Sequence, residues 1–348
     1  MRTILDNLNI ALHDAMHCDD RVIVLGEDIL DPYGGAFKVT RGLSDRFPER
    51  VITTPISEAG IVGVATGLGL AGFLPIVEIM FGDFLTLVSD QVINHASKFR
   101  WMYNDQVRVP IVIRTPMGGR RGYGPTHSQT LEKLFLGVPG LQVLAPCPIG
   151  NPGKLLNYAV FNCEDPVLFL ENKLLYALPS DKYLDSKELI IREIDPQPDI
   201  DLPDMLHPEI SDRPQTYSMA VRDAPHVSIT IAAYGHMVEY AQQAIIDLAY
   251  EDEIFCEVII PTQLTPWKLD PIFTSVKKTG RLIVIEEGTK SLGWGAEIVA
   301  QVSEQPDVNV KNIRRVASLE YPIPASEPLE SAMLPGKNQI KEVAKSII

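Results

Sequence analysis

The stretch that decides the fold is residues 51–79, which read VITTPISEAGIVGVATGLGLAGFLPIVEI. The run 51–53 is apolar or β-branched and precedes a turn at Pro55, which is typical of a short buried strand. Small and apolar residues then continue without a proline, and they predict a helix over 57–71. A second apolar run predicts another strand over 75–79. A strand, a helix and a strand in this order indicate a βαβ unit of a parallel sheet.

The glycines at 67–72 also match the GxGxxG pattern of dinucleotide-binding folds. That pattern requires a helix to begin at the glycines, because the N-terminus of the helix binds the pyrophosphate. Pro75 and the strand over 75–79 follow too closely for a helix to begin there. We therefore favour a helix over 57–71 whose small residues let another backbone or subunit approach. A free-standing NAD enzyme that uses these glycines stays open as an alternative. The small residues are Ala59, Gly60, Gly63 and Gly67.

The same alternation of strands and helices extends to both sides of this unit. Leu5, Leu8 and Leu12 recur at helical spacing near the N-terminus. Further strands are expected at 22–25, 111–113, 143–144 and 167–170, and further helices over 83–100 and from Ser128 onward. Apolar strands that alternate with helices indicate a parallel sheet covered on both faces. Ligands of such sheets bind at the carboxyl ends of the strands.

The alternation is interrupted once and then returns. Residues 180–225 are rich in proline and acidic residues, which is typical of a linker or extended arm. Strands are again expected at 227–233, 257–260 and 281–285, with helices after His236 and from Trp294. We therefore predict an α/β protein of two doubly wound domains. The expected division is 1–184 for the first domain, 185–222 for an acidic, Pro-rich linker, and 223–348 for the second domain.

Composition excludes several classes of protein. The chain has 348 residues and a net charge of −14, which disfavours a dedicated nucleic-acid binder. A hydrophobic fraction of 45% excludes a disordered chain. We expect neither a membrane segment nor a secretory signal. The four cysteines show no metal-binding spacing, so no metal site is expected and a reducing, cytoplasmic location is favoured. They are Cys18, Cys147, Cys163 and Cys256.

Three polar features come directly after predicted strands. Glu27 follows the strand at 22–25, Glu58 begins the helix over 57–71, and a glycine-rich loop ends at His127. A carboxylate in the first turn of a helix often serves only to stabilise the helix through its dipole, without a functional role. Because the neighbours of Glu58 are small or apolar, the alternative is a partly buried acid with a raised pKa that exchanges protons near neutral pH.

The glycine-rich loop allows two interpretations. A histidine in such a loop is often only solvated, and Ser128 would cap the next helix. The loop also carries Arg120 and Arg121, which could bind an anionic substrate. Similarly, Gly293-Trp-Gly-Ala-Glu297 could form an anion site at a helix N-terminus, or it could only allow close packing of helix and strand.

Five motifs taken together resemble one family. They are Gly26-Glu-Asp28, Thr54-Pro-Ile-Ser-Glu-Ala-Gly60, Asp90-Gln-Val-Ile-Asn94, His127-Ser-Gln129 and Gly295-Ala-Glu297. Their order and spacing resemble those of the β subunit of the E1 component of 2-oxo acid dehydrogenase complexes, of the pyruvate, branched-chain and acetoin type. The resemblance covers nearly the whole chain except about residues 185–222.

This resemblance implies a transketolase-like subunit. The first domain would be the pyrimidine-binding domain for thiamine diphosphate, and the second the transketolase C-terminal domain. A partner α subunit would bind the diphosphate and Mg²⁺ through a GDG motif, and Gly82-Asp83 in this chain is followed by Phe84 instead of glycine. The active site would lie between α and β in an α2β2 assembly. The acyl product would pass to a lipoyl group of an E2 component or to another carrier.

The resemblance also implies roles for individual residues. Glu58 would face N1′ of the aminopyrimidine ring and share a proton with it. Phe84 would lie against that ring, and Glu27 would be a second active-site acid. His127 would lie near the substrate, where it would handle protons or guide acyl transfer.

The sequence departs from the family at three places. The arm at 185–222 is longer than the resemblance to this family leads us to expect, by about fifteen residues. Cys163 stands beside a monovalent-cation site of relatives and puts potassium binding in doubt. Arg120 and Arg121 replace smaller or uncharged residues, which could alter substrate choice. A non-catalytic assembly subunit of the same fold is the alternative, and the intact Glu27, Glu58 and His127 argue against it.

Overall fold

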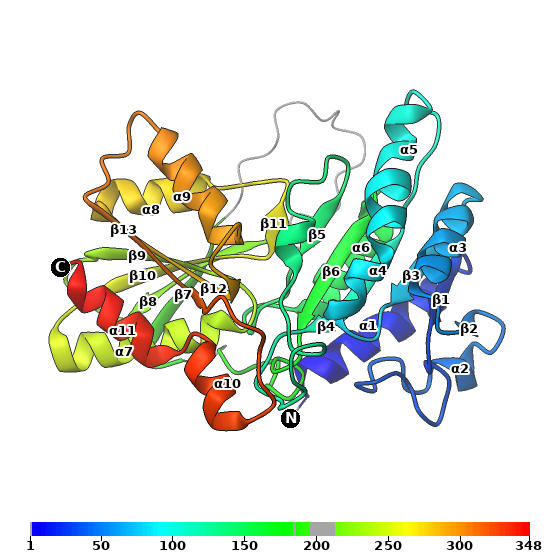
Figure 1. The fold of residues 1–348 in the computed structure, drawn as a ribbon, viewed down its shortest axis with the longest axis horizontal. Coiled ribbons are helices and arrows are strands. Elements are labelled where there is room, and N and C mark those ends of the chain that lie inside the picture. The colour runs from blue at the N-terminus through cyan, green and yellow to red at the C-terminus, as the bar shows by residue number, and fades with distance from the viewer. Residues whose placement is uncertain (1, 184–185, 195–212) are drawn as a thin grey trace.

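The computed structural model describes residues 2–183, 186–194 and 213–348. Among these residues the chain forms a seven-stranded sheet with the order β11-β5-β6-β4-β3-β1-β2 and a six-stranded sheet with the order β13-β12-β9-β10-β8-β7. The two sheets lie side by side, and helices flank each of them (Figure 1). The prediction of an α/β protein built from two doubly wound sheets is confirmed.

The first sheet is parallel except for one strand at its edge. Its strands are β1 (Val22–Gly26), β2 (Val51–Thr53), β3 (Leu74–Glu78), β4 (Val112–Met117), β5 (Gln142–Leu144), β6 (Val167–Asn172) and β11 (Gln263–Thr265). Strand β11 comes from the second half of the sequence and pairs antiparallel with β5. The expected strands in this half are all present, but nothing in the pattern predicted β11.

Side chains alternate between the two faces of this sheet, as strand geometry requires. Along β1, Ile23 and Leu25 belong to the core under α3 and α4, whereas Val22 and Val24 belong to the core under α1 and α6. The helices of this half are α1 (Ile4–Cys18), α2 (Leu43–Arg46), α3 (Glu58–Leu70), α4 (Leu85–Asp90), α5 (Ser97–Met102) and α6 (Pro152–Asn162). Both faces are therefore buried, which explains the continuously apolar strands.

Helix α3 confirms the prediction for the deciding stretch. It begins at Glu58, with Ser57 as its N-cap, and ends at Leu70. The glycines at 67–72 thus lie at the C-terminal end of α3 and not at the start of a helix. These glycines therefore cannot bind a pyrophosphate as a dinucleotide-binding fold does, because that binding requires the N-terminus of a helix.

Two expected helices differ in the structure. The helix over 83–100 is present, but a π-helical segment (η2, Gln91–Ala96) interrupts it between α4 and α5. The prediction of a helix from Ser128 onward is wrong, because only a 3₁₀ turn (η3, Glu132–Leu134) forms there. The backbone of Gln129 explains the difference, because its N–H donates to Asp83 and its carbonyl accepts from Gly118. These contacts hold the segment extended beside the end of β4.

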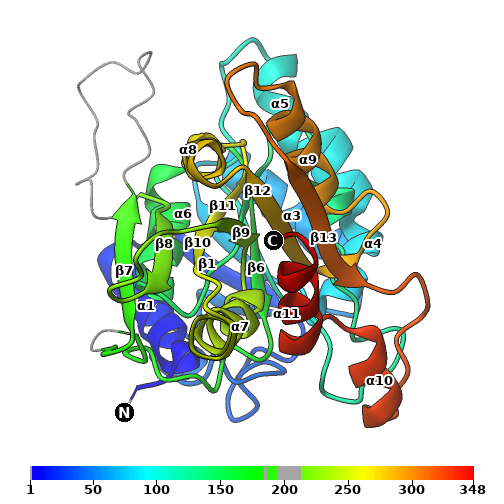
Figure 2. The same cartoon turned by 90° about the vertical axis from the view of Figure 1, so that its left-hand side faces the viewer.

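The second sheet has a parallel core, beside which β8 pairs antiparallel with β10 and the edge strand β7 pairs antiparallel with β8. Its strands are β7 (Leu189–Ile194), β8 (Thr216–Val221), β9 (Ile229–Ala233), β10 (Cys256–Pro261), β12 (Arg281–Thr289) and β13 (Asn312–Ser318). Its helices are α7 (Met237–Asp252), α8 (Asp270–Thr279), α9 (Trp294–Glu304), α10 (Glu327–Met333) and α11 (Lys337–Ser346). Figure 2 shows α7 and α11 on one face of the sheet and α8 and α9 on the other.

Strands β7 and β8 lie within the segment expected to be a linker, 185–222. They pair antiparallel along their whole length, from Leu189 opposite Val221 to Ile194 opposite Thr216. The prolines between 196 and 208 lie outside the described residues. The described parts of the expected linker thus extend the second sheet, because their alternating apolar residues pack onto its core.

A buried ion triad joins three strands beneath the carboxyl ends of the first sheet. The guanidinium of Arg114 on β4 donates to both carboxyl oxygens of Glu171 on β6, at 2.9 and 2.6 Å. It also donates to Glu78 on β3. Tyr176 adds a hydroxyl hydrogen bond to Glu171. All three charged side chains are at least 95% buried, so each depends on the others for its charge.

We expect Arg114→Met to lower the free energy of unfolding by about 3–5 kcal/mol, because it leaves two carboxylates buried without a cation. Urea titration of the purified chain measures this loss. The matched control is Arg108→Met, whose side chain is 35% exposed and whose surface pairs are worth less than about 1 kcal/mol. Equal losses in the two variants would contradict the special role of the buried triad.

Candidate active site

The sheet order brings the candidate residues to one edge. Strands β6, β4, β3, β1 and β2 are consecutive neighbours in the first sheet. Lys173 follows β6, the loop 118–127 follows β4, Phe84 follows β3, Glu27 follows β1 and Glu58 follows β2. Because these strands are parallel, the segments that follow them share the carboxyl edge, where ligands of such sheets bind.

Glu27 and Glu58 form a buried acid pair at this edge. Their residues are 6% and 7% exposed. Burial raises the pKa of Glu27, and the charges of Glu58 and Asp28 raise it further. Oε1 of Glu27 has no hydrogen-bond partner within the described part of the chain. The pair therefore offers a carboxyl oxygen that is withdrawn from solvent and still available to a ligand.

His127 lies in a cluster of aromatic rings. Its imidazole meets Phe81 edge-on at 4.7 Å between ring centroids and Phe84 at 5.4 Å. Tyr123 meets Phe81 from the same loop, at 5.9 Å. Thr126 contacts Nδ1 of His127 through its hydroxyl, at 3.0 Å. The structure thus brings His127 and Phe84 together and holds the imidazole ring against an apolar wall.

Asp83 connects the end of β3 to the segment after His127. Its Oδ1 accepts hydrogen bonds from the backbone N–H of Gln129, at 3.2 Å, and from the Gln129 side chain, at 2.8 Å. Its Oδ2 is buried without a hydrogen-bond partner among the described residues. The sequence motif His127-Ser-Gln129 identified the histidine, but the positioning contact made by Gln129 was not foreseen.

The loop 118–127 is bound by carboxylates of the second half. Glu287 on β12 accepts from the backbone N–H of Gly119, at 2.6 Å, and from the side-chain amide of Asn172, at 2.8 Å. Glu330 on α10 accepts from the N–H groups of Arg120 and Gly122, at 2.7 and 3.2 Å. Two acidic residues that are far away in sequence thus fix the shape of the loop.

The two arginines of the loop differ in their surroundings. The guanidinium of Arg120 donates to the carbonyls of Leu334 and Pro335, at 3.3 and 2.6 Å, and lies 4.9 Å from the ring centroid of Tyr240. It therefore binds the second half of the chain. Arg121 is exposed.

The helix N-terminus at Gly293-Trp-Gly-Ala-Glu297 is occupied by an internal carboxylate. Glu286 accepts from the N–H of Gly295, at 3.0 Å, and from the Arg315 guanidinium, at 2.6 Å. A β-carbon at Gly293 would lie 2.2 Å from the Glu286 carboxylate. Close packing thus accounts for the glycines, and Glu286 takes the position that a bound anion would need.

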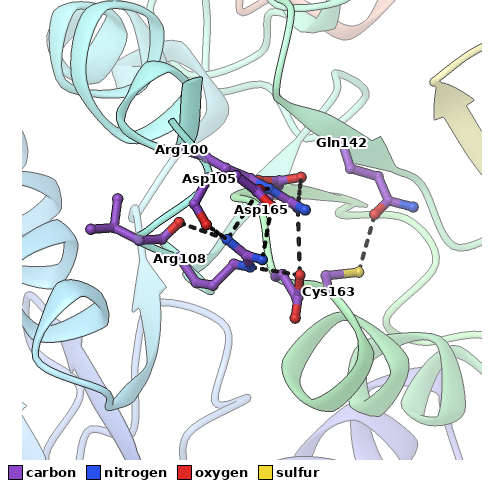
Figure 3. A network of polar contacts seen from close by, with 8 residues as sticks. Arg100, Asp105, Arg108, Gln142, Cys163 and Asp165 are labelled. Atoms are coloured by element: carbon purple, nitrogen blue, oxygen red, sulfur yellow. Dashed lines mark hydrogen bonds and ion pairs between the residues drawn. The ribbon is translucent and has the colours of Figure 1, made fainter. Parts of the chain in front are cut away.

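Two arginine side chains, Arg100 and Arg108, bind the acidic residues next to Cys163 (Figure 3). The guanidinium of Arg100 lies 2.6 Å from Asp105 and 3.0 Å from Asp165. Arg108 donates to Glu164 at 2.7 Å. These carboxylates are therefore already neutralised by cations of the chain itself.

Cys163 borders the same network (Figure 3). Its thiol donates to Oε1 of Gln142, at 3.1 Å. Burial raises the pKa of this thiol to about 12, so the neutral form prevails near neutral pH. A neutral thiol is a poor ligand for a hard cation such as potassium, which prefers oxygen.

Glu132 lies fully buried where the two halves meet. Neither oxygen of its carboxyl has a hydrogen-bond partner among the described residues. Burial and the charge of Glu286 raise the pKa of Glu132 to about 8, while Tyr234 and Lys133 act in the opposite direction. His236, on the same boundary, has a pKa lowered to about 4 because burial and the charges of Arg120 and Lys182 disfavour its protonation. The contact between the halves thus contains groups whose pKa values change on folding.

The described residues lack both a metal-binding cluster and a membrane-spanning helix. They hold no cluster of three or more His, Cys, Asp or Glu side chains able to hold a metal ion. None of their helices has the length and apolar character needed to cross a membrane.

Two family models match the two halves of the chain, although strand β11 of the first sheet falls within the second match. A family model described as transketolase, pyrimidine binding domain, matches residues 2–179. A second model, described as transketolase, C-terminal domain, matches residues 218–340. A solved structure titled split gene transketolase, inactive beta4 tetramer, has a similar fold, with a TM-score of 0.70 at 18% identity over 99% of this chain and 98% of that chain.

Three curated relatives are similar over nearly the whole chain. The 3-methyl-2-oxobutanoate dehydrogenase subunit beta of Mycobacterium tuberculosis is 32% identical over 99% of this chain and 92% of its own length. The mitochondrial pyruvate dehydrogenase E1 component subunit beta-1 of Arabidopsis thaliana is 36% identical over 99% and 88%. The 2-oxoisovalerate dehydrogenase subunit beta of Pseudomonas aeruginosa is 35% identical over 99% and 95%.

The raised pKa of Glu132 predicts a pH dependence of stability. Between the ordinary value of 4.5 and about 8, the folded chain holds a proton that the unfolded chain releases, so stability falls as pH rises through this range. We expect the unfolding free energy of the wild type to fall relative to that of Glu132→Gln over this range and then to level off. Urea titrations of both proteins at several pH values measure the difference.

The comparison with Glu132→Gln cancels the contributions that other titrating groups make to the pH dependence of stability. His236 acts with the opposite sign, because its lowered pKa makes stability rise from about pH 4 to the ordinary value of 6.5. This contribution is present in both proteins and cancels in the difference. Parallel pH curves for the two proteins would contradict the assignment to Glu132.

Proposed function

Because the chain belongs to the transketolase-like E1 β subunits of 2-oxo acid dehydrogenases, we propose that it is the β subunit of a thiamine-diphosphate-dependent enzyme that decarboxylates a 2-oxo acid and transfers the acyl group. The observation that carries this proposal is the buried pair Glu27 and Glu58 at the carboxyl edge of the first sheet. A proton-exchanging acid withdrawn from solvent is what the cofactor requires of this subunit.

The residues present fit the pyrimidine half of thiamine diphosphate. Glu58 would accept or donate a proton at N1′ of the ring, and Phe84 would lie against the ring face. The unpartnered oxygen of Glu27 would meet a polar atom of the ring or of the substrate. When bound, the cofactor supplies the electron sink for the decarboxylation of the 2-oxo acid.

Glu27 can hold a proton under conditions in which a solvated carboxyl would lose it. Burial and the neighbouring charges of Glu58 and Asp28 raise the pKa of Glu27, so its carboxyl keeps a proton at higher pH than a solvated carboxyl does. Glu58 stands in the first turn of α3, with its residue buried beside Glu27. The pair can therefore supply and recover a proton without help from solvent.

His127 and Arg121 are the candidates for contact with the substrate. The imidazole of His127 is packed between Phe81 and Phe84, and it would handle a proton of the substrate or guide acyl transfer. Of the two arginines in its loop, Arg121 keeps an exposed guanidinium able to attract a carboxylate.

We propose an α-type partner that completes the site in an α2β2 assembly. The relatives are named as β subunits, which implies such a partner. The partner would bind the diphosphate and Mg²⁺, and an E2 component or another acyl carrier would receive the product. The four cysteines are free, which fits a reducing, cytoplasmic location.

Glu58→Gln tests the proposal directly. In complex with the α-type partner, we expect 2-oxo acid turnover to fall by at least about 100-fold, because the amide cannot exchange a proton with the cofactor ring. The rate of 2-oxo acid decarboxylation measures the effect, and size-exclusion chromatography checks that the assembly survives.

The control is Glu304→Gln, an exposed acid at the end of α9 that should leave turnover unchanged. Near-normal turnover of Glu58→Gln would refute the role of Glu58. An intact wild-type complex that decarboxylates none of a panel of 2-oxo acids would favour the alternative, a non-catalytic assembly subunit.

A further inference from the structure

Lys173 is a buried cation that none of the roles above uses. It directly follows β6, and its backbone N–H extends the pairing with β4 by donating to Met117, at 2.9 Å. Its residue is 0% exposed, which is rare for lysine because an ammonium group loses its hydration on burial. Such a side chain needs partners inside the protein.

The partners of Lys173 all belong to the His127 cluster. Its Nζ donates to the backbone carbonyl of His127. It also lies 5.2 Å from the ring centroid of Phe81 and 5.1 Å from that of Tyr123, which are cation–π distances. One carbonyl and two aromatic faces thus contact the ammonium directly, and the more distant charges of Asp83, Glu287 and Glu330 also favour it.

The position of Lys173 differs from that of the other anchors of the loop. Glu287 and Glu330 bind the first part of the loop, at Gly119, Arg120 and Gly122. Only Lys173, among the described contacts, reaches the backbone of His127 from the sheet. The same ammonium faces Phe81, the ring on which the imidazole rests.

We propose that Lys173 is a positioning residue for His127, holding its backbone and the rings of Phe81 and Tyr123 so that the imidazole stays directed at the substrate. This inference rests on the proposed function of His127. Lys173 acts through the histidine and does not itself contact substrate or cofactor. A displacement of about 1 Å in such a group can reduce the rate by roughly 100-fold.

Lys173→Met keeps the length of the side chain and removes the charge. In complex with the α-type partner, we expect kcat to fall by about 10- to 100-fold, while binding of thiamine diphosphate is retained. Lys277→Met, on the exposed side of α8, is the matched control. A kcat within about twofold of the wild type would overturn the inference, because a 1 Å displacement costs more.

A double-mutant cycle separates a positioning role from a general structural one. If Lys173 acts through His127, the pair His127→Ala and Lys173→Met should lose no more activity than His127→Ala alone. Additive losses would overturn the inference, because they would place the effect of Lys173 outside His127.

A pH profile gives a second readout. Burial lowers the pKa of Lys173 to about 8, although Asp83, Glu287 and Glu330 favour its charge, and Arg121 disfavours it further. Loss of the charge weakens the contacts to both rings, so we expect kcat of the wild type to fall above about pH 8. This basic limb should be absent in Lys173→Met, and its persistence there would overturn the inference.

Hydrogen exchange tests the inference without any activity. We expect the amides of residues 118–130 to exchange faster in Lys173→Met than in the wild type, with no change in the strands β1 and β12. Unchanged exchange of the loop would overturn the positioning role. This result is independent of the proposed reaction, so a failure of the proposed function and a failure of this inference remain distinguishable.

Discussion

The carboxylate of Glu287 connects the two halves of the molecule at the place where chemistry is proposed. It accepts hydrogen bonds from Gly119 at the end of β4 and from Asn172 at the end of β6, and it stands on a strand of the second sheet. Such charge-assisted bonds to backbone N–H groups are shorter and stronger than neutral ones. The glycine-rich loop owes its shape to this contact and to Glu330, so the second half of the chain determines the geometry of a site in the first.

The boundary between the halves is polar where a sheet of this kind ordinarily binds a ligand. The carboxyl ends of β9 and β12 face the first half, and the segment from Gly118 to Leu134 occupies that region. Glu132 and Glu286 are buried there together, and burial raises the pKa of both carboxyls. The contact therefore depends on hydrogen bonds and protonation as well as on apolar packing, which ties the placement of the loop to solution conditions.

The periodicity of apolar residues predicted the helices and strands that short stretches of sequence specify. It failed where contacts between residues far apart in the sequence determine the structure. The apolar runs gave the strands, and the family of the chain followed from five short motifs. Glu27 and Glu58 were found because both follow strands directly. The anchors Glu287 and Glu330 could not be found in this way, because they lie 115 to 210 residues from their partners. The helix expected after Ser128 fails for the same reason, since Asp83 binds the backbone of Gln129. Lys173 had one usable signal, a charged residue at the end of an apolar strand.

Strand β11 is supplied by the half that carries the second family model, yet it completes the sheet of the first. Its pairing with β5, reinforced by a hydrogen bond of 2.9 Å between Ala145 and Thr262, covers an edge that would otherwise be open. An uncovered edge invites pairing with other chains. The halves are thus not interchangeable modules: in evolution, a recombination that exchanged one half would have to inherit a matching edge strand or produce a protein prone to aggregation.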